Sequence, residues 1–263
     1  MISPGGTYPE LVERWESLQS SGIRLHRIVC EPSDRTLLCA DLGDPRLPSV
    51  AIAAGVHGDE PAGAWALLHL AERNELPPEF SYRIWPCTNP SGFAARTRQN
   101  ADGIDVNRTF GGDGASPEAT AIVATNRGSR FSLSIDLHED CDAAGFYCYE
   151  YGGGDFGQRV VAALAANGFP IDPLEATFDL AGPLDDANCS REPGRVVADA
   201  AREAVALGGL SYSLALARSG VRRVLTFETP SAAAWEARVA MHVTAVSCAL
   251  DALLEESAHA KRK

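Results

Sequence analysis

The sequence contains 263 residues, 45% of them hydrophobic, and its formal net charge at neutral pH is −12. This length and apolar content suffice for one large α/β domain or two small ones, and they argue against a disordered chain. The negative charge disfavours nucleic acids and anionic membrane surfaces as partners.

The N-terminal residues and the cysteines indicate a cytoplasmic protein. The first residues lack the basic and apolar segments of a secretory signal, and no stretch looks long and apolar enough to span a bilayer. The seven cysteines are scattered, odd in number and without a Cys-x-x-Cys pair. This pattern favours reduced thiols over a disulfide framework. We therefore expect a cytoplasmic protein with no membrane partner, and the sequence leaves the oligomeric state open.

The first part of the chain alternates between helical and strand-like patterns. Apolar residues recur at helical spacing over residues 8–18, which predicts an amphipathic helix. Residues 24–30 and 36–42 alternate enough to form the two strands of a hairpin. A short apolar run over residues 49–54 predicts a buried strand, and residues 61–73 predict a helix with proline in its first turn.

The middle of the chain carries a long polar loop between two predicted strands. Residues 81–87 predict the first strand, and the loop over residues 93–114 is too long and too polar to be a simple connection. Ser116 is the predicted N-cap of the next helix, with Pro117 at its first position. Residues 130–137 predict the second strand, because alternate side chains are apolar.

The last part continues the alternation. The sequence predicts strands at residues 145–151 and 221–227. It predicts helices at residues 156–167, 194–206 and 231–256, and an irregular stretch at 170–193 separates the first two of these helices. The chain shows no internal repeat and no linker. Strands that alternate with helices therefore indicate a single α/β domain over residues 1–263 with a largely parallel sheet.

Three predicted strands end in residues that suit a metal site. The strand at 49–54 leads to His57 and Glu60, and two later strands lead to His138 and Glu228. Ligands of such sheets bind outside the carboxyl ends of the strands. We therefore expect these four side chains to converge.

His57, Glu60 and His138 form the set of two histidines and one glutamate that holds a catalytic zinc ion and leaves a position for water. Alone, the spacing of His57 and Glu60 is a weak signal, because a polar strand end before an acidic helix start gives the same residues. The third residue, His138, makes the pattern a candidate site. The other four histidines lie inside predicted elements or in the tail, and we interpret them as core or solvated residues.

Glu228 is the candidate general base. A carboxylate at the end of a buried strand is partly desolvated, which raises its pKa, and it can pass a proton from water to a leaving group. The alternative interpretation is a solvated glutamate just before a helix start.

The polar loop supplies cations. Arg98 and Arg108 can clamp a substrate carboxylate or stabilise an oxyanion. Asp105 can accept the second N–H of His57 and fix its tautomer. Each of these residues alone also fits a charged surface loop.

These segments together resemble the zinc carboxypeptidase superfamily, which comprises the carboxypeptidase A-like metallopeptidases and the related succinylglutamate desuccinylase and aspartoacylase group. The matching segments stand in the family's order, from the first metal motif almost to the last helix. They are Gly55-Val56-His57-Gly58-Asp59-Glu60, Asn89-Pro90-Ser91-Gly92, Asp105-Val106-Asn107-Arg108-Thr109-Phe110, Asp136-Leu137-His138 and Thr226-Phe227-Glu228-Thr229.

The resemblance implies a twisted mixed sheet of about eight strands flanked by helices, with one zinc ion as cofactor. It also implies a role for each site residue: His57, Glu60 and His138 as zinc ligands, Glu228 as general base, Arg98 as oxyanion stabiliser, Asn107 and Arg108 as the clamp on a substrate carboxylate, and Asp105 as a support behind the ligands.

Two features differ from the digestive carboxypeptidases. The interval from Glu60 to His138 is short, as in the deacylases and the small bacterial murein-peptide amidases. The digestive enzymes also place a substrate-binding tyrosine about one helix before the base, and residues 202–205 contain no tyrosine. The candidate replacements are Tyr212 or one of Tyr147, Tyr149 and Tyr151.

The sequence therefore predicts a zinc-dependent metallocarboxypeptidase or amidase. It would hydrolyse an amide bond next to a free carboxylate in small peptides, with murein-derived peptides as one candidate. The alternative is an N-acyl amino acid deacylase of the succinylglutamate desuccinylase/aspartoacylase type, which uses the same metal chemistry. A third hypothesis is a non-catalytic peptide-binding module. The expected partner is accordingly a small peptide or an acyl amino acid.

Overall fold

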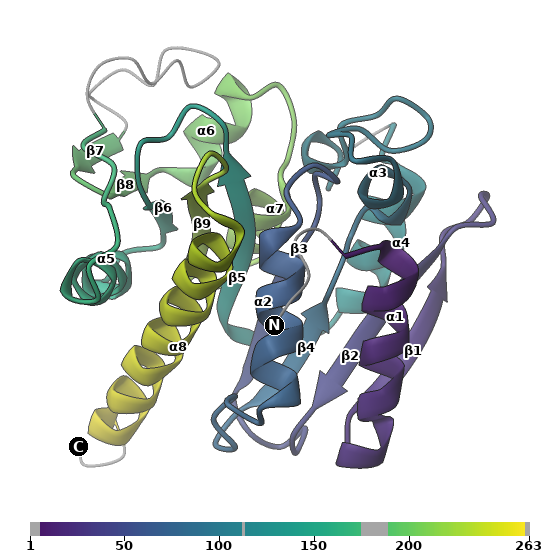
Figure 1. Ribbon diagram of the computed structural model, residues 1–263, viewed down its shortest axis with the longest axis horizontal. Coiled ribbons are helices and arrows are strands. Elements are labelled where there is room, and N and C mark those ends of the chain that lie inside the picture. Colours follow the sequence, from purple (N-terminus) through teal and green to yellow (C-terminus); the bar gives the residue numbers. More distant parts are fainter. Residues whose placement is uncertain (1–5, 112–113, 175–188, 261–263) are drawn as a thin grey trace.

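The computed structural model describes residues 6–111, 114–174 and 189–260. Nine strands in these ranges form one sheet in the order β1-β2-β4-β3-β5-β9-β6-β8-β7 (Figure 1). The strands are β1 (Arg24–Val29), β2 (Thr36–Leu42), β3 (Ser49–Ala54), β4 (Ser81–Trp85), β5 (Phe131–Asp140), β6 (Tyr147–Tyr151), β7 (Cys189–Glu192), β8 (Arg195–Ala198) and β9 (Val224–Pro230). The helices are α1 (Tyr8–Ser17), α2 (Ala62–Glu72), α3 (Pro90–Ala95), α4 (Pro117–Asn126), α5 (Phe156–Ala166), α6 (Ala200–Ala206), α7 (Tyr212–Arg218) and α8 (Trp235–Ala260), with 3₁₀ turns η1 (Leu18–Ser21) and η2 (Val106–Arg108).

The centre of the sheet is parallel. Strands β4, β3, β5 and β9 run in the same direction, whereas β2 pairs antiparallel with β4 and β6 pairs antiparallel with β9. A parallel strand that is covered on both faces of the sheet needs apolar side chains on both faces. Strand β3 meets this requirement, because Val50 and Ile52 belong to the buried cluster on one face and Ala51 belongs to the buried cluster on the opposite face. The prediction of a single α/β domain with a mixed sheet is confirmed, with nine strands in the described ranges in place of about eight.

Helices cover both faces of the sheet. α1, α2, α8 and α5 lie side by side on the face toward the viewer in Figure 1. On the opposite face α7 packs against β5 and β9, and α4 adds Ala119 and Ile122 to the second buried cluster. Because both faces are covered, polar side chains of the central strands can meet a ligand only near the strand ends.

Helix α8 is the one helix in the described ranges that is long and apolar enough to cross a membrane by length and composition. The expectation that no stretch meets this criterion is therefore wrong. Half of the apolar window of α8 is buried inside the protein, where the helix packs against α2 and α5. Because a buried core helix passes the same test, this finding is weak support for a membrane span.

The sequence pattern misplaces several element boundaries. Residues 194–206 were expected to be one helix, but they contain β8 and then α6, because Val196 and Ala198 alternate inward and Asp199 caps the shorter helix. Strand β7 lies in the stretch expected to be irregular, and part of that stretch falls outside the described residues. Strands β5 and β9 also continue to Asp140 and Pro230, beyond their expected ends.

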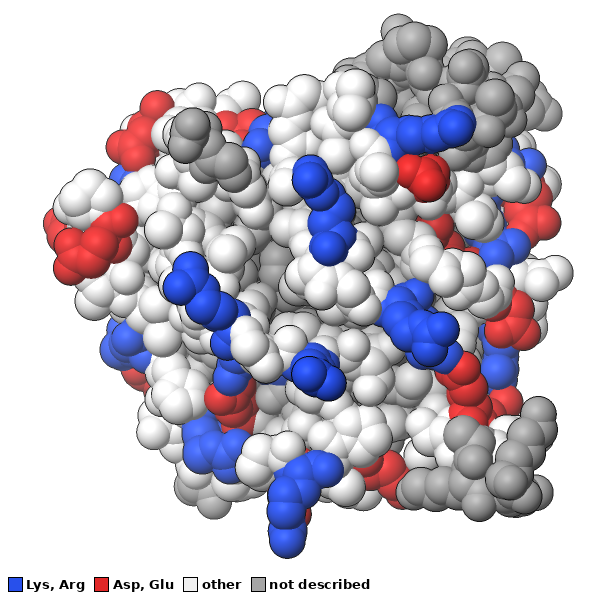
Figure 2. Space-filling model, turned by 180° about the vertical axis from the view of Figure 1, so that it is seen from behind, with Lys and Arg blue, Asp and Glu red and all other residues white. Residues whose placement is uncertain are grey.

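Charge is unevenly distributed over the molecule. The two lysines are Lys261 and Lys263, so every positively charged side chain in the described ranges is an arginine or a histidine. Figure 2 shows the face opposite to that of Figure 1, where basic side chains are spread across the centre and most acidic ones lie toward the margins. Part of the acidic excess instead lines the cavity described below.

The segment between β3 and α2 passes very close to α3. The backbone N–H of Gly58 donates a hydrogen bond to the Thr97 carbonyl oxygen, at an N···O distance of 2.9 Å. A Cβ atom at Gly58 would lie 1.9 Å from the carbonyl carbon of Gly92, a backbone atom that cannot move aside as a side chain can. Only glycine at position 58 therefore allows the segment with His57 and Glu60 to lie in this place.

We predict that Gly58→Ala lowers the free energy of unfolding by about 3 kcal/mol or more, since overpacking against fixed backbone costs this much. Gly22→Ala is the matched control, because its added Cβ meets nothing within 4 Å although its φ of +86° is also unfavourable for alanine. The control should lose only about 1–2 kcal/mol. Denaturant unfolding of both variants measures the difference, and equal losses would contradict the predicted close approach.

Candidate metal centre

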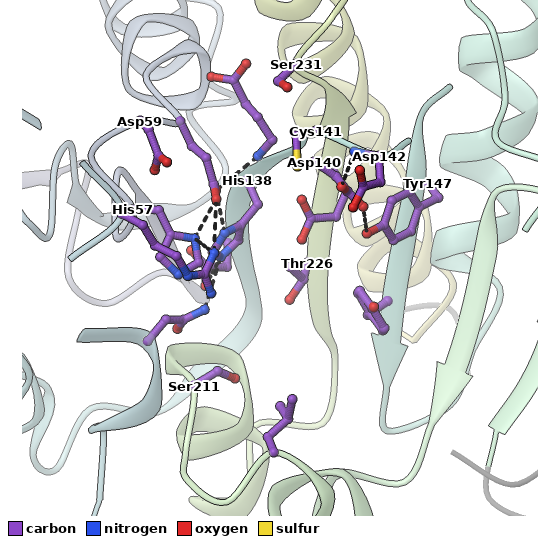
Figure 3. A pocket seen from close by; sticks show the side chains of 18 of the residues that line it. His57, Asp59, His138, Asp140, Cys141, Asp142, Tyr147, Ser211, Thr226 and Ser231 are labelled. Carbon is purple, nitrogen blue, oxygen red and sulfur yellow. Dashed lines mark hydrogen bonds and ion pairs between the residues drawn. The ribbon is translucent and has the colours of Figure 1, made fainter. Parts of the chain in front are cut away.

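Two chain segments bring two imidazoles and a carboxylate together at the carboxyl ends of β3 and β5. His57 and Glu60 lie between β3 and α2, and His138 lies near the end of β5. The Glu60 Oε1 atom is 2.6 Å from His57 Nδ1, and Glu60 Oε2 is 2.8 Å from His138 Nδ1. Figure 3 shows the two labelled histidines pointing toward one another beside β9, with ring centroids 5.0 Å apart. The predicted ligand set therefore converges in space.

A carboxylate lies behind each imidazole. The Nε2 atom of His57 is 3.3 Å from Asp105 Oδ1, and the Nε2 atom of His138 is 3.1 Å from Asp136 Oδ2. A carboxylate that accepts from Nε2–H leaves Nδ1 unprotonated in a neutral imidazole. In that tautomer, Nδ1 of each histidine can offer a lone pair to a cation that would lie beside the Glu60 carboxylate.

This arrangement fits a divalent cation. Ligand atoms of His57, Glu60 and His138 all lie within 4.8 Å of one another, and all three side chains are buried. Two nitrogen lone pairs and a carboxylate would repel each other in a site with little water, unless a positive charge lies among them. Imidazole nitrogens with one carboxylate suit zinc better than magnesium or calcium, which prefer oxygen ligands.

The pKa shifts in this cluster have the signs of an ion-paired site. Burial would raise the pKa of Glu60, but the charges of His57 and His138 outweigh burial and hold that pKa below its usual range. Burial would lower the pKa of His138, but Asp136 and Glu60 outweigh it and raise that pKa well above the usual value. The cluster therefore favours positive charge between the carboxylates.

Glu228 lies beside His138 across the sheet. In the parallel pairing of β5 with β9, His138 and Glu228 are directly opposed, so neighbouring strands hold them on the same face. Burial raises the pKa of Glu228 well above its usual range, and the charges of Glu60 and Asp140 raise it further, although His138 lowers it. A carboxyl group with a raised pKa suits proton transfer to and from water at neutral pH.

Arg98 lies next to the candidate ligands. Its guanidinium donates to Asp105, with an Nε–Oδ2 distance of 3.1 Å, and one terminal nitrogen lies 3.6 Å from Glu60 Oε1. The side chain is 38% exposed and borders the cavity. A substrate oxygen near the metal centre could therefore accept from Arg98.

Asn107 and Arg108 also border this cavity. The Asn107 side-chain oxygen accepts from the backbone N–H of Tyr212 at 3.0 Å, and its amide nitrogen is 3.5 Å from His138 Nε2. An Arg108 terminal nitrogen donates to the Asn107 carbonyl oxygen at 3.0 Å. These contacts fix η2 beside the metal centre.

Glu139 anchors the segment that carries Glu60. Its buried carboxylate accepts from the backbone N–H of Ala62 at 2.7 Å and forms an ion pair with Arg238 of α8. The backbone N–H of Glu139 in turn donates to Glu60 Oε2 at 3.1 Å. The first turn of α2, the end of β5 and α8 are thereby joined next to the metal centre.

The metal centre opens into a cavity of about 810 Å³. Every second residue of β6 is a tyrosine, so the side chains of Tyr147, Tyr149 and Tyr151 lie on one face of the sheet and form one wall of the cavity. The Tyr147 hydroxyl donates a hydrogen bond to the Asp140 carboxylate at 2.8 Å (Figure 3). These three tyrosines border the cavity, so they remain candidates for the missing substrate-binding tyrosine. Tyr212 does not border it, since its ring packs edge-on against Phe110.

Glu203 of α6 also borders the cavity and is 6% exposed. Its Oε1 atom accepts from the Tyr151 hydroxyl at 2.9 Å. Burial raises the pKa of Glu203 to about 7, although the Tyr151 hydrogen bond and the charge of Arg108 lower it.

Sequence reasoning missed two residues of the site, Asp136 and Glu203. Asp136 had a usable signal, because it stands two residues before His138 in a predicted strand and therefore on the same face. Glu203 had none, because its burial results from the packing of α6 near β6. The structure brings together all eight residues predicted for the site, and their chemical roles remain predictions.

Comparison with known proteins agrees with this geometry. Residues 46–171 match the succinylglutamate desuccinylase/aspartoacylase catalytic domain family. The sequence is 32% identical over 119 residues to carboxypeptidase SOL1 of Arabidopsis thaliana. The match covers 38% of this chain and 24% of that protein. The chain thus spans about a quarter of that curated relative.

The fold is similar to those of two proposed metallopeptidases. The protein from Shewanella baltica gives a TM-score of 0.72 at 22% identity, with 95% of this chain and 98% of that chain covered. The protein from Shewanella amazonensis gives a TM-score of 0.71 at 25% identity, with 94% and 92% covered. The similarity therefore extends over nearly the whole of this chain.

We predict that Asp136→Asn lowers zinc affinity about 10- to 100-fold, because an amide can present N–H to His138 and no longer fixes the tautomer. Competition with a chromophoric chelator measures the affinity. Ser134→Ala is the matched control, since Ser134 is buried on the same face of β5 two residues earlier. Unchanged affinity in Asp136→Asn would contradict the role of Asp136.

We also predict that Glu203 makes stability depend on pH. Its pKa rises from the ordinary 4.5 to about 7 on folding, so its stabilising contribution is complete below 4.5 and is lost as pH rises through 7. The loss amounts to about 3 kcal/mol at most. Glu203→Gln should therefore gain stability relative to the unmodified protein between pH 5 and pH 8.

Denaturant unfolding at pH 5, 6, 7 and 8 tests this dependence on Glu203. The control is Glu13→Gln, which removes an exposed carboxylate on α1 and should leave the difference from the unmodified protein constant. If the difference in free energy of unfolding between Glu203→Gln and the unmodified protein also stays constant with pH, Glu203 has the ordinary pKa of a glutamate.

Proposed function

We propose that this chain, which belongs to the zinc carboxypeptidase superfamily, is a zinc-dependent hydrolase that cleaves an amide bond next to a free carboxylate in small peptides. One observation carries the proposal: the buried His57, Glu60 and His138 cluster has Glu228 directly opposite His138 on the neighbouring strand. A metal site with a carboxylate of raised pKa beside it is the constellation that metal-assisted hydrolysis requires.

His57, Glu60 and His138 would hold the ion. When bound, zinc polarises a carbonyl group and makes a water molecule more acidic. Asp105 and Asp136, which lie next to Nε2 of the two imidazoles, would favour the tautomer that offers Nδ1 to the ion.

Glu228 would move the proton. Its carboxylate takes a proton from the attacking water as the carbon–oxygen bond forms, and it delivers that proton to the amide nitrogen as the carbon–nitrogen bond breaks. The raised pKa of Glu228 suits both transfers, because the group can hold a proton at neutral pH.

Arginines would orient the substrate. Arg98 lies beside Glu60 and is positioned to donate to the oxygen that becomes negative during attack. Arg108, supported by Asn107, would bind the free carboxylate of the substrate, so that the scissile bond lies next to the metal centre.

A second candidate function is supported by the family match. Residues 46–171, which include the three candidate metal ligands, match a succinylglutamate desuccinylase/aspartoacylase catalytic domain. An N-acyl amino acid deacylase would use these ligands on a substrate with a different leaving group. The intact segments at residues 89–92 and 107–110 favour peptides. Murein-derived peptides are one substrate class of this kind.

Substrate profiling separates these candidates. The zinc-loaded protein is incubated with N-blocked peptides that end in a free carboxylate, with the same peptides as C-terminal amides, and with N-succinyl and N-acetyl amino acids. We expect release of C-terminal amino acids from the free peptides and little from the amides. Release of succinate or acetate instead would establish the deacylase.

We predict that Glu228→Gln reduces kcat about 100- to 10,000-fold, the usual contribution of general acid–base catalysis, while bound zinc stays at one ion per chain. Asp142→Asn is the matched control, because it removes the same charge from a residue of the same cavity. Equal activity in Glu228→Gln and the unmodified protein would contradict the mechanism. No activity in either, with any of the substrates, would favour a binding module.

A further inference from the structure

A second groove lies on the face of the sheet that α4 and α7 cover. It has a volume of about 570 Å³ and is lined mainly by apolar side chains, among them Phe110, Ile122, Phe131 and Leu216. Val123 of α4 also lines the groove, and this side chain is 42% exposed. A groove of this size and composition suits a small ligand with an apolar body.

This groove is separate from the metal-centre cavity, and within the described ranges the two share no lining residue. Tyr212 lies between them: its ring lines the groove, and its backbone N–H donates to Asn107 beside the metal centre. From Tyr212 the groove extends to Phe131, the first residue of β5. Phe131 precedes His138 by seven residues, which corresponds to about 23 Å at about 3.3 Å per strand residue. A ligand at this far end of the groove does not reach the metal centre.

The far end of the groove is basic. The turn between α4 and β5, residues 126–130, forms this end and contributes the side chains of Arg127 and Arg130. Arg83 of β4 holds the turn in place, because its guanidinium donates to the Ser129 hydroxyl at 3.1 Å. The two arginines at the far end are therefore carried by a braced turn.

Arg127 and Arg130 have no carboxylate partner. Arg83 pairs with Asp41, whereas neither Arg127 nor Arg130 forms an ion pair within the part of the chain that the structure describes. No acidic residue of those ranges lines the groove. Figure 2 shows this face of the molecule, with basic side chains spread across its centre. Two neighbouring guanidinium groups without a counter-ion attract a carboxylate, which each of them can bind through two hydrogen bonds.

Asn126 can add a third donor at this end. Its side chain lines the groove, and its Oδ1 atom is buried but accepts no hydrogen bond from the described residues. Because no donor holds the amide oxygen in this direction, the amide can turn and offer its NH₂ group to an anion. The unpaired amide and the two unpaired arginines thus favour the same kind of ligand.

We propose that this groove is a second ligand site, which binds a carboxylate with an apolar body such as a medium-chain fatty acid. The carboxylate accepts hydrogen bonds from Arg127 and Arg130, and the apolar chain packs against Ile122, Phe131 and Leu216. An uncharged ligand with the same chain gains the apolar contacts alone. Binding in the groove does not require the hydrolysis proposed for the metal centre.

The test compares octanoate with 1-octanol, which has the same number of carbon atoms but no charge, by calorimetric binding to the zinc-loaded protein. We expect octanoate to bind about 10- to 100-fold more tightly, the range of a charged hydrogen bond. In the double variant Arg127→Gln/Arg130→Gln this preference should fall to near one through weaker binding of octanoate alone. Both arginines are exposed, so the variant should fold, and its circular dichroism spectrum checks this. Arg222→Gln removes an exposed arginine that does not line the groove and should keep the preference.

A carboxylate also suits the metal-centre cavity, so octanoate binding is measured in Arg108→Gln and in the zinc-free protein as well. Binding in the groove should survive both changes and disappear in the double variant. If octanoate does not bind, or if its binding depends on Arg108 and zinc but not on Arg127 and Arg130, the proposal is overturned.

Sedimentation of the ligand-free protein tests the other occupant of such a groove, a second copy of the chain. We expect the same mass for the unmodified protein and for Arg127→Gln/Arg130→Gln. A dimer that dissociates in the double variant would assign the groove to an interface between two copies and would overturn the ligand site.

Discussion

The site depends on one buried carboxylate that faces two imidazoles. Glu60 reaches His57 from its own segment and His138 from the neighbouring strand, at 2.6 and 2.8 Å. Folding must desolvate all three groups, which is costly unless positive charge is placed among them. Much of the surrounding structure keeps this arrangement in place: Asp105 and Asp136 lie behind the rings, and Glu139 ties the start of α2 to β5.

The sequence predicts the metal side of the site well because its signals are local. Apolar runs predict β3 and β5, and the polar residues that follow them must then lie at the same edge of a parallel sheet. Boundaries were less accurate, since His138 and Glu228 lie within strands that continue past their expected ends. The prediction of one helix over 194–206 is wrong for a physical reason. The alanines of this segment suit a helix, but its β-branched valines suit a strand, and residues 195–198 form that strand by pairing with β6 and β7.

The other side of the cavity results from tertiary packing, which local patterns do not report. Strand β6 pairs antiparallel with β9 rather than with β5, its neighbour in sequence. This pairing places Tyr147 opposite Glu228 and brings Tyr149 and Tyr151 to the border of the same cavity. Glu203 looks like any helical glutamate in the sequence, and only the position of α6 makes it a buried group. The convergence of His57, Glu60 and His138 was therefore predictable, whereas the shape of the cavity was not.

The row formed by His138, Glu228 and Tyr147 crosses three adjacent strands in register. Their mutual spacing is thus fixed by the hydrogen bonds between backbones, about 4.8 Å from strand to strand, and not by the course of any loop. Loops around the cavity can lengthen or shorten without disturbing this geometry. An insertion of one residue within β9 has the opposite effect: it turns the glutamate to the far face of the sheet and brings a neighbour such as Phe227 or Thr229 into its place.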